Sequence, residues 1–191
     1  MVKLLRIFTR GGDKGKTSLG DGTRHYKNSL RLHAIGDVDE LNSAIGVAKV
    51  YVLDSDQGIL GRIQNDLFDV GADLCIPLDP TKPEALRIIE PQITALEAGI
   101  DMITQKLNPL RSFVLPGGTE AAAYLHMARA IARRAERSCV CLSLEEDINP
   151  FILQYLNRLS DFLFVMARYA NGKGKKDVLW VPGENQLIEN E

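Results

Sequence analysis

The sequence predicts an all-α fold, a five-helix antiparallel bundle that follows a glycine-rich N-terminal loop. Apolar residues recur at steps of three and four along five long segments, which is helical spacing. Stretches rich in proline and glycine separate these segments and would stop each helix. Only residues 3–8 and 178–182 look extended, so strands do not alternate with helices and a parallel α/β sheet is disfavoured.

The first three helices are expected over residues 30–52, 56–75 and 85–107. The second segment ends at IPLDPTKPEA, whose three prolines cannot continue a helix. The third ends at NPLRSFVLPGG, which predicts a loop between two large helices.

The last two helices are expected over residues 119–144 and 148–171, with Gly172 and Gly174 as terminators. The stretches GKGKKD and GENQLIENE then look like a mobile tail. Residues 1–191 are therefore interpreted as one domain, with an N-terminal nucleotide loop (1–28), a helical bundle (29–171) and a tail (172–191).

The composition limits the classes of partner. Among 191 residues, 23 Lys and Arg nearly balance 25 Asp and Glu, so no global field favours nucleic acid or an acidic membrane. No apolar run approaches the roughly 20 residues that span a bilayer. Three cysteines form neither a CxxC pair nor an even disulfide set. We expect a cytoplasmic protein with no nucleic-acid or membrane partner.

The N-terminal segment FTRGGDKGKTSLGDGTRHYKN has the composition of a phosphate-binding loop. Its glycines let backbone N–H groups converge on an anion, while hydroxyl and cationic side chains offer further contacts. Gly15, Lys16 and Thr17 resemble the end of a Walker loop, but Arg10 stands where its first glycine is required, and SLGDGT reads as a turn. The alternative interpretation is an exposed basic arm.

A row of charged side chains on the fourth helix is a candidate anion clamp. Projected at 100° per residue, HMARAIARRAERSCV places four of them on one edge, beside a stripe of small residues: Arg129, Arg133, Glu136 and Arg137. Planar guanidinium groups suit bidentate phosphate contacts. The alternative is a solvated face with ion pairs three or four residues apart. Arg134 points away from this edge.

The fifth helix, FILQYLNRLSDFLFVMARYAN, is apolar almost all round, which predicts burial on several sides. Its polar residues therefore need partners. Asn157 and Asp161 lie four residues apart on one line, where they either belong to a buried network or face a ligand such as a purine or ribose edge.

Four blocks in order along nearly the whole chain carry a family resemblance. They are TRGGDKGKTSLGDG, GDVDELNSAIG, RSFVLPGGT, and RRAER together with NRLSD. Together these blocks resemble the ATP:cob(I)alamin adenosyltransferases of the propanediol-utilisation type. Gly11 is a departure, because family members commonly have Thr there.

The resemblance implies a ferritin-like five-helix bundle that forms a homotrimer, with ATP and cobalamin bound where subunits meet. It implies Mg²⁺ at the phosphates, no metal site formed by the protein alone, and a nucleotide site formed by Thr9, Arg10, Gly11, Gly12, Thr17, Ser18, Lys27, Arg133, Arg134, Glu136, Arg137 and Asn157. The implied catalytic residues are Asp39, Phe113, Arg129 and Arg133. Asp39 would pair with Arg129 across the subunit boundary, and Phe113 would exclude the lower axial base of cobalamin.

The activity implied by the resemblance is transfer of the 5′-deoxyadenosyl group of ATP to the cobalt of cob(I)alamin, giving adenosylcobalamin and triphosphate. A reductase and an adenosylcobalamin-dependent enzyme are further candidate partners. Two alternatives stay open: an ATP-dependent phosphotransferase that uses the GKT loop, and a non-catalytic cobalamin-binding bundle. Asp37 and Glu40, spaced D-x-x-E, suggest a helix cap, so a structural role is expected for Asp37.

Overall fold

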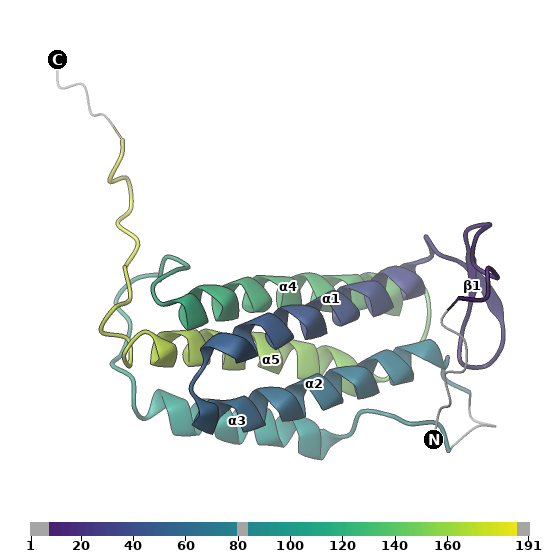
Figure 1. The fold of residues 1–191 in the computed structure, drawn as a ribbon, viewed down its shortest axis with the longest axis horizontal. Helices are drawn as coiled ribbons and strands as arrows, with labels where there is room; N and C mark the ends of the chain where they lie inside the picture. Colours follow the sequence, from purple (N-terminus) through teal and green to yellow (C-terminus); the bar gives the residue numbers. More distant parts are fainter. Residues whose placement is uncertain (1–7, 80–83, 187–191) are drawn as a thin grey trace.

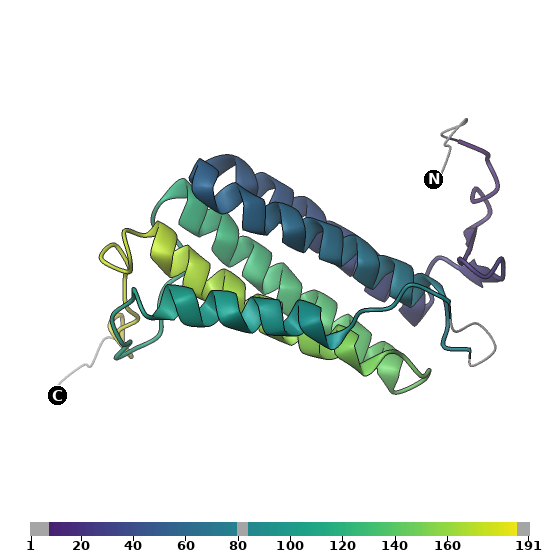
Figure 2. The ribbon, with the colours of Figure 1, turned by 90° about the horizontal axis from the view of Figure 1, so that it is seen from below.

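The computed structural model describes residues 8–79 and 84–186, which form five helices and one two-stranded sheet. The helices are α1 (Leu30–Tyr51), α2 (Asp54–Cys75), α3 (Glu90–Thr104), α4 (Glu120–Ser143) and α5 (Pro150–Ala170). The strands are β1 (Lys16–Ser18) and β2 (Arg24–Tyr26). The predicted five-helix bundle is confirmed, and Figures 1 and 2 show the helices along one long axis with the sheet beyond one end.

The helices are antiparallel to their neighbours along the chain, and one additional pair is parallel. The packed pairs are α1 with α2, α1 with α4, α4 with α5, and α3 with α5. Asn149, just before α5, binds the carbonyl of Ile88, just before α3. Arg168, near the end of α5, binds the carbonyl of Asn108, just past α3. α3 and α5 therefore run in the same direction, and Figures 1 and 2 show them in this parallel arrangement.

The core lies along the facing sides of all five helices, and α3 contributes Ile93 and Leu96 to it. Large apolar side chains such as Leu41, Leu67 and Phe162 are buried there, and each contributes about 1.5–3 kcal/mol. The stripe of small residues predicted on α4 is fully buried: Ala128, Ala132, Ala135 and Cys139. Small side chains let α4 approach its two neighbours closely. Within residues 8–79 and 84–186, no helix has both the length and the hydrophobicity to cross a bilayer.

The third helix is shorter than its apolar spacing predicts, spanning Glu90–Thr104 instead of 85–107. The segment before it is extended because buried polar groups hold it. Asp73 accepts from Arg87 Nη1 at 2.7 Å and from the Ile88 backbone N–H at 2.9 Å. Pro91, which lacks a backbone N–H, then stands in the first turn, where no donor is needed.

Capping contacts explain three of the other helix ends. Thr119 and Asn149 cap α4 and α5 by accepting from backbone N–H groups of the first turn. Gly172 follows α5 with a φ of 65°, the left-handed conformation that ends a helix. The D-x-x-E interpretation as a cap is wrong, because α1 begins at Leu30 and Asp37 lies inside it.

The segment 172–177 is docked on the bundle, which corrects the expectation of a mobile tail there. Arg168 pairs with Asp177 at 2.8 Å, and their side chains are only 8% and 3% exposed. Leu179 then pairs with Val114 in an antiparallel bridge, as expected for an extended stretch. Residues 3–7 of the other stretch that looked extended, and residues 187–191 of the tail, lie outside the described residues.

Candidate functional site

The GKT triplet lies in a β-hairpin. β1 and β2 pair antiparallel, with Lys16 opposite Tyr26 and Ser18 opposite Arg24. Leu19 closes the turn by donating its N–H to the carbonyl of Thr23 at 2.9 Å. A Walker loop requires a helix directly after its Lys and Thr, and here the chain turns back into a second strand. The prediction that SLGDGT forms a turn is confirmed.

The loop before the hairpin has an unusual backbone and a lysine laid across it. Arg10 has a φ of 59°, and Thr9 Oγ1 accepts from the Gly11 N–H at 3.5 Å. A Cβ at position 12 would lie 3.1 Å from Lys27 Nζ, so Gly12 lets the Lys27 ammonium approach the backbone. These residues, predicted to bind phosphate, therefore form one exposed, cationic surface together with the adjacent hairpin.

Arg24 holds this surface together, and its role was missed by the sequence analysis. Its guanidinium donates to the carbonyls of Gly11 at 2.7 Å and Lys16 at 3.4 Å, and to Ser18 Oγ at 3.3 Å. The sequence gives little indication of this role, because the contact of Arg24 with Ser18 depends on the hairpin register that places the two residues opposite each other. Arg24 thus preorganises the loop.

The base of the loop is fixed on the end of α2. Leu19 is buried, and the Gly20 N–H donates to the carbonyl of Cys75 at 2.9 Å. A Cβ at Gly20 would lie only 2.8 Å from Ile76 Cγ1, so this close approach requires glycine. The phosphate-binding candidate is therefore attached to a rigid element.

The arginine row on α4 lines a hollow of about 490 Å³, called here the nucleotide hollow. Its lining residues are Arg133, Glu136, Arg137, Val140, Cys141 and Asn157. Asn157 of α5 donates to Glu136 Oε1 at 2.9 Å, which joins the two helices across the floor. Four residues predicted to bind the nucleotide thus line one hollow. Val140 and Cys141 also line it, and the arginine pattern gave no indication of them.

A second hollow, of about 710 Å³, lies one turn back along α4 and is called here the aromatic hollow. Arg129, Phe113, Phe164 and Trp180 are among its lining residues. Burial, and then the neighbouring charge of Arg133, lower the pKa of Arg129 from its usual value. Its Nε atom is buried and has no hydrogen-bond partner among the described residues.

Asp39 and Phe113 are both exposed. Asp39 lies on the outer face of α1 and makes no ion pair with Arg129 or any other described residue of its own chain. Phe113 is 76% exposed and contacts Trp180, with ring centroids 6.0 Å apart. An exposed aromatic ring beside a hollow is typical of a ligand contact rather than of a core anchor.

Arg134 faces α1 instead of the nucleotide hollow. It pairs with Asp37 at 3.2 Å and also with Glu40, and hydrogen bonding to Arg134 lowers the pKa of Glu40. Asp37 also accepts a hydrogen bond from Ser138 of α4. These contacts join α1 to α4, so they favour a structural role for Arg134 over the nucleotide contact implied by the resemblance.

The loop and the arginine row do not touch within one chain. Among the described residues, no hydrogen bond or ion pair links residues 8–28 to Arg129, Arg133, Glu136 or Arg137. Figure 1 shows the hairpin beyond the end of the bundle where α1 begins. Two surfaces with the same phosphate-binding chemistry are thus present in one protomer but separated.

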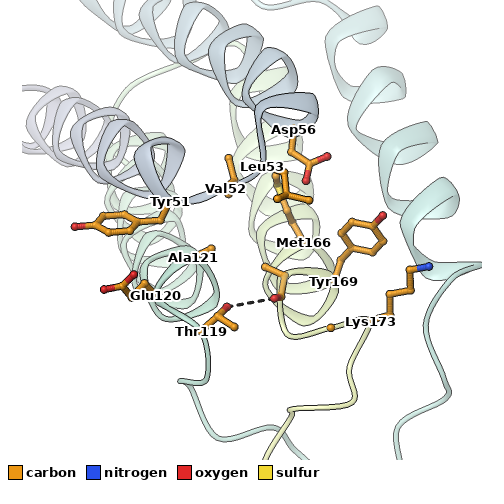
Figure 3. A pocket seen from close by; sticks show the side chains of 12 residues that line it. Tyr51, Val52, Leu53, Asp56, Thr119, Glu120, Ala121, Met166, Tyr169 and Lys173 are labelled. Carbon is orange, nitrogen blue, oxygen red and sulfur yellow. Dashed lines mark hydrogen bonds between the residues drawn. The ribbon is translucent and has the colours of Figure 1, made fainter.

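A further cavity, of about 410 Å³, lies where α1 turns into α2 and α4 begins (Figure 3). Tyr51, Leu53, Met166 and Tyr169 are among its lining residues, and Thr119 donates to the carbonyl of Ala170 at its edge. It contains none of the predicted site residues. The predicted site residues that line a cavity lie instead at the nucleotide hollow and the aromatic hollow.

Comparisons with known proteins identify relatives of this chain along nearly its whole length. The family model for cobalamin adenosyltransferase matches residues 7–170. A corrinoid adenosyltransferase of Mycobacterium tuberculosis is 46% identical over 187 residues, which cover 95% of this chain and 96% of that protein. A cobalamin adenosyltransferase of Cupriavidus metallidurans is 46% identical over 181 residues, which cover 93% and 95%.

Solved structures show the same likeness. A variant PduO-type ATP:corrinoid adenosyltransferase from Lactobacillus reuteri, complexed with cobalamin and ATP, gives a TM-score of 0.88 at 41% identity, covering 93% of this chain and 97% of that one. Another variant, complexed with ATP, gives a TM-score of 0.85 at 42% identity, with coverages of 92% and 100%.

Proposed function

Since this chain belongs to the cobalamin adenosyltransferase family, we propose that it transfers the 5′-deoxyadenosyl group of ATP to the cobalt of a corrinoid. The observation that carries the proposal is a pair of hollows that α4 lines one helical turn apart, the first with Arg133, Arg137 and Asn157 and the second with Arg129 and Phe113. The first hollow has the charged and amide groups of a nucleotide site. The second has the aromatic lining of a site for a large, partly apolar ligand.

The spacing along α4 suits a transfer between the two hollows. Arg129 and Arg133 are four residues apart and therefore lie on one helix face. ATP held at Arg133 and a corrinoid held beside Phe113 would meet near Arg129. The side chains supply alignment, which removes much of the entropic barrier of a reaction between two bound molecules.

The transfer requires little covalent chemistry from the protein. The electron pair of cob(I)alamin forms the new bond to the 5′ carbon, and the bond from that carbon to the triphosphate oxygen breaks. Arg133 and Arg137 would stabilise the charge that develops on the leaving oxygen. Phe113 would keep the lower axial position of cobalt empty, which favours reduction to the electron-rich cob(I) state.

We place the active site between subunits of a homotrimer. The N-terminal loop of one subunit would close over the nucleotide hollow of its neighbour, because the two surfaces do not meet within one chain. Asp39 of one subunit would likewise pair with Arg129 of the next, whose Nε atom has no hydrogen-bond partner among the described residues of its own chain. Assembly would therefore complete the site.

The loop would bind the triphosphate with backbone N–H groups, hydroxyls and cations: Thr9, Arg10, Gly11, Gly12, Thr17, Ser18 and Lys27. Mg²⁺ fits here as a partner of the phosphates, because it takes oxygen ligands from phosphate, water and hydroxyl groups such as Thr17. It would neutralise part of the phosphate charge. The described residues contain no cluster of three or more His, Cys, Asp or Glu able to hold a metal, so ATP phosphates and water would supply most of its ligands.

The decisive experiment is an anaerobic assay with ATP and chemically reduced corrinoid. We expect the absorption spectrum of a cobalt–carbon product, together with intact triphosphate. Release of ADP would favour a phosphotransferase instead. Corrinoid binding without any product would favour a non-catalytic bundle.

In the same assay, Arg133→Ala should lower kcat/KM about ten- to a hundredfold. A charge-assisted hydrogen bond contributes about 1.5–3 kcal/mol, and each 1.4 kcal/mol changes a rate about tenfold. Arg133 is exposed, so the unliganded melting temperature should stay unchanged. Arg62→Ala, which removes an exposed arginine from α2, is the matched control and should keep full activity. A large loss of unliganded stability with normal turnover would make Arg133 structural.

A further inference from the structure

The segment that follows α5 lies along the loop that carries Phe113. The Leu115 N–H donates to the carbonyl of Val178 at 2.8 Å, and the Trp180 N–H donates to the carbonyl of Phe113, also at 2.8 Å. Ser112 Oγ donates to the Trp180 carbonyl at 2.6 Å. Residues 112–115 and 178–180 are thus joined as a short antiparallel pair.

This pairing has a buried anchor. Asp177, the residue before the pair, is held by Arg168 Nε at 2.8 Å and by Asn171 Nδ2 at 3.1 Å. Arg168 also donates to the carbonyl of Asn108, and Asn171 to that of Gly117, which are the two ends of the Phe113 loop. The end of α5 therefore fixes both the loop and the segment that lies on it.

The pairing brings two aromatic rings together at the aromatic hollow. The centroids of Phe113 and Trp180 are 6.0 Å apart and their planes are tilted by 52°, a favourable geometry for an aromatic pair. Phe113 is 76% exposed and Trp180 44% exposed. Among the described residues, this is the one ring pair that Phe113 forms. Trp180 is therefore the aromatic neighbour against which the Phe113 ring lies.

We propose that Trp180 is a positioning residue, which holds the Phe113 ring in the place where it keeps the lower axial position of the corrinoid cobalt empty. This inference rests on the proposed function. A ring that must exclude a competing ligand has to be confined beforehand, because an unconfined exposed side chain would lose rotamer entropy on each binding event. Trp180 acts on cobalt only through Phe113.

The test compares Trp180→Ala with Trp180→Phe in the full-length protein with ATP bound and cob(II)alamin at saturation. Electron paramagnetic resonance measures the four-coordinate fraction of the corrinoid. We expect Trp180→Ala to lower this fraction about tenfold and to lower kcat while the KM for ATP stays unchanged. Trp180→Phe should restore most of the four-coordinate fraction and most of kcat, because it keeps an aromatic ring against Phe113. Val181→Ala, which removes an exposed apolar side chain from the next position, should behave as the unaltered protein.

Three outcomes would overturn the inference. Trp180→Ala could keep the four-coordinate fraction, in which case Phe113 needs no support. It could abolish corrinoid binding, in which case Trp180 is a binding residue. It could melt well below the unaltered protein, with Trp180→Phe equally impaired in the four-coordinate fraction, in which case its role is structural.

The unaltered protein separates this inference from the proposed function. Trp180 is the one tryptophan of the chain, so its fluorescence reports on the aromatic hollow without any turnover. Cobalamin should quench that fluorescence at saturation. An unaltered protein that neither quenches nor forms product would refute the proposed function itself, whereas normal activity with an unimpaired Trp180→Ala variant would refute the inference alone.

Discussion

At Gly11 the chain has room for the side chain and hydroxyl of a threonine. A Cβ there would meet Thr9 Oγ1 at 3.5 Å, an ordinary contact. We expect Gly11→Thr to tighten ATP binding about two- to tenfold, because a new hydrogen bond contributes about 0.5–1.5 kcal/mol. Isothermal titration calorimetry measures the change. Gly15→Thr is the control, since its φ of +76° should cost about 1–2 kcal/mol and give no gain. Weaker ATP binding by Gly11→Thr would show that the backbone, not a side chain, is needed there.

His126 should make stability depend on pH. It is 2% exposed, neither ring nitrogen has a partner among the described residues, and burial followed by the charge of Arg129 lowers its pKa below 6.5, with Asp177 opposing. The folded state therefore binds fewer protons than the unfolded state. The stability that His126 contributes is present above pH 6.5 and is lost as pH falls below it.

Melting temperatures between pH 7 and pH 5 would measure this effect. His126→Leu should flatten the decline over that range, whereas His33→Leu, at an exposed position of α1, should leave it intact. An identical decline in His126→Leu and the unaltered protein would assign the pH dependence to other groups.

At the scale of elements, long periodic helices were predictable and short tertiary features were not. The apolar spacing located all five helices because each carries several turns of pattern. It overextended α3, because the contacts of Asp73 with Arg87 and Ile88 keep residues 86–89 out of the helix and cannot be read from local spacing. The hairpin was missed because its strands have only three residues each.

The same distinction holds for the candidate site. Projection of a single helix brought Arg133, Glu136 and Arg137 onto one edge, and the structure places them in one hollow. Arg24 and Trp180 were missed, because each acts through a partner from another segment. Helical periodicity predicts which face of a helix a side chain occupies. It does not predict which residues of a distant loop contact that face.

Asp73 joins three elements, and its loss should be costly. Its buried carboxylate pairs with Arg87 at 2.7 Å and accepts from Asn149 Nδ2, also at 2.7 Å, so it ties the end of α2 to the approach to α3 and the start of α5. We expect Asp73→Ala to lower the free energy of unfolding by about 3–5 kcal/mol, because it leaves a cation without its buried partner. Urea denaturation measures the loss. Asp101→Ala, at an exposed position of α3, should change it by less than about 0.5 kcal/mol. A loss below about 1 kcal/mol for Asp73→Ala would show that the joint is held by apolar packing alone.

At the scale of the whole molecule, the separation of the loop from the arginine row predicts that mixed assemblies recover activity. Lys27→Ala damages only the loop, and Arg133→Ala damages only the row. If each site takes its loop from one subunit and its row from the next, random mixing of the two impaired chains gives an intact pair in about a quarter of the sites.

Co-refolding the two variants at equal concentration, followed by the anaerobic assay, should therefore restore about a quarter of the unaltered activity. The matched control mixes Arg133→Ala with Arg137→Ala, which damage the same row, so every site keeps a defect and no activity should return. Mixing the two variants before refolding allows mixed assemblies to form, whereas mixing them after separate refolding gives only the sum of their residual rates. The comparison therefore isolates the activity that comes from mixed assemblies. Recovery in neither order, from assemblies shown by mass to contain both chains, would mean that each site takes its loop and its row from the same chain. The site would then have to be complete within one chain, which the position of the hairpin beyond the bundle end makes difficult (Figure 1).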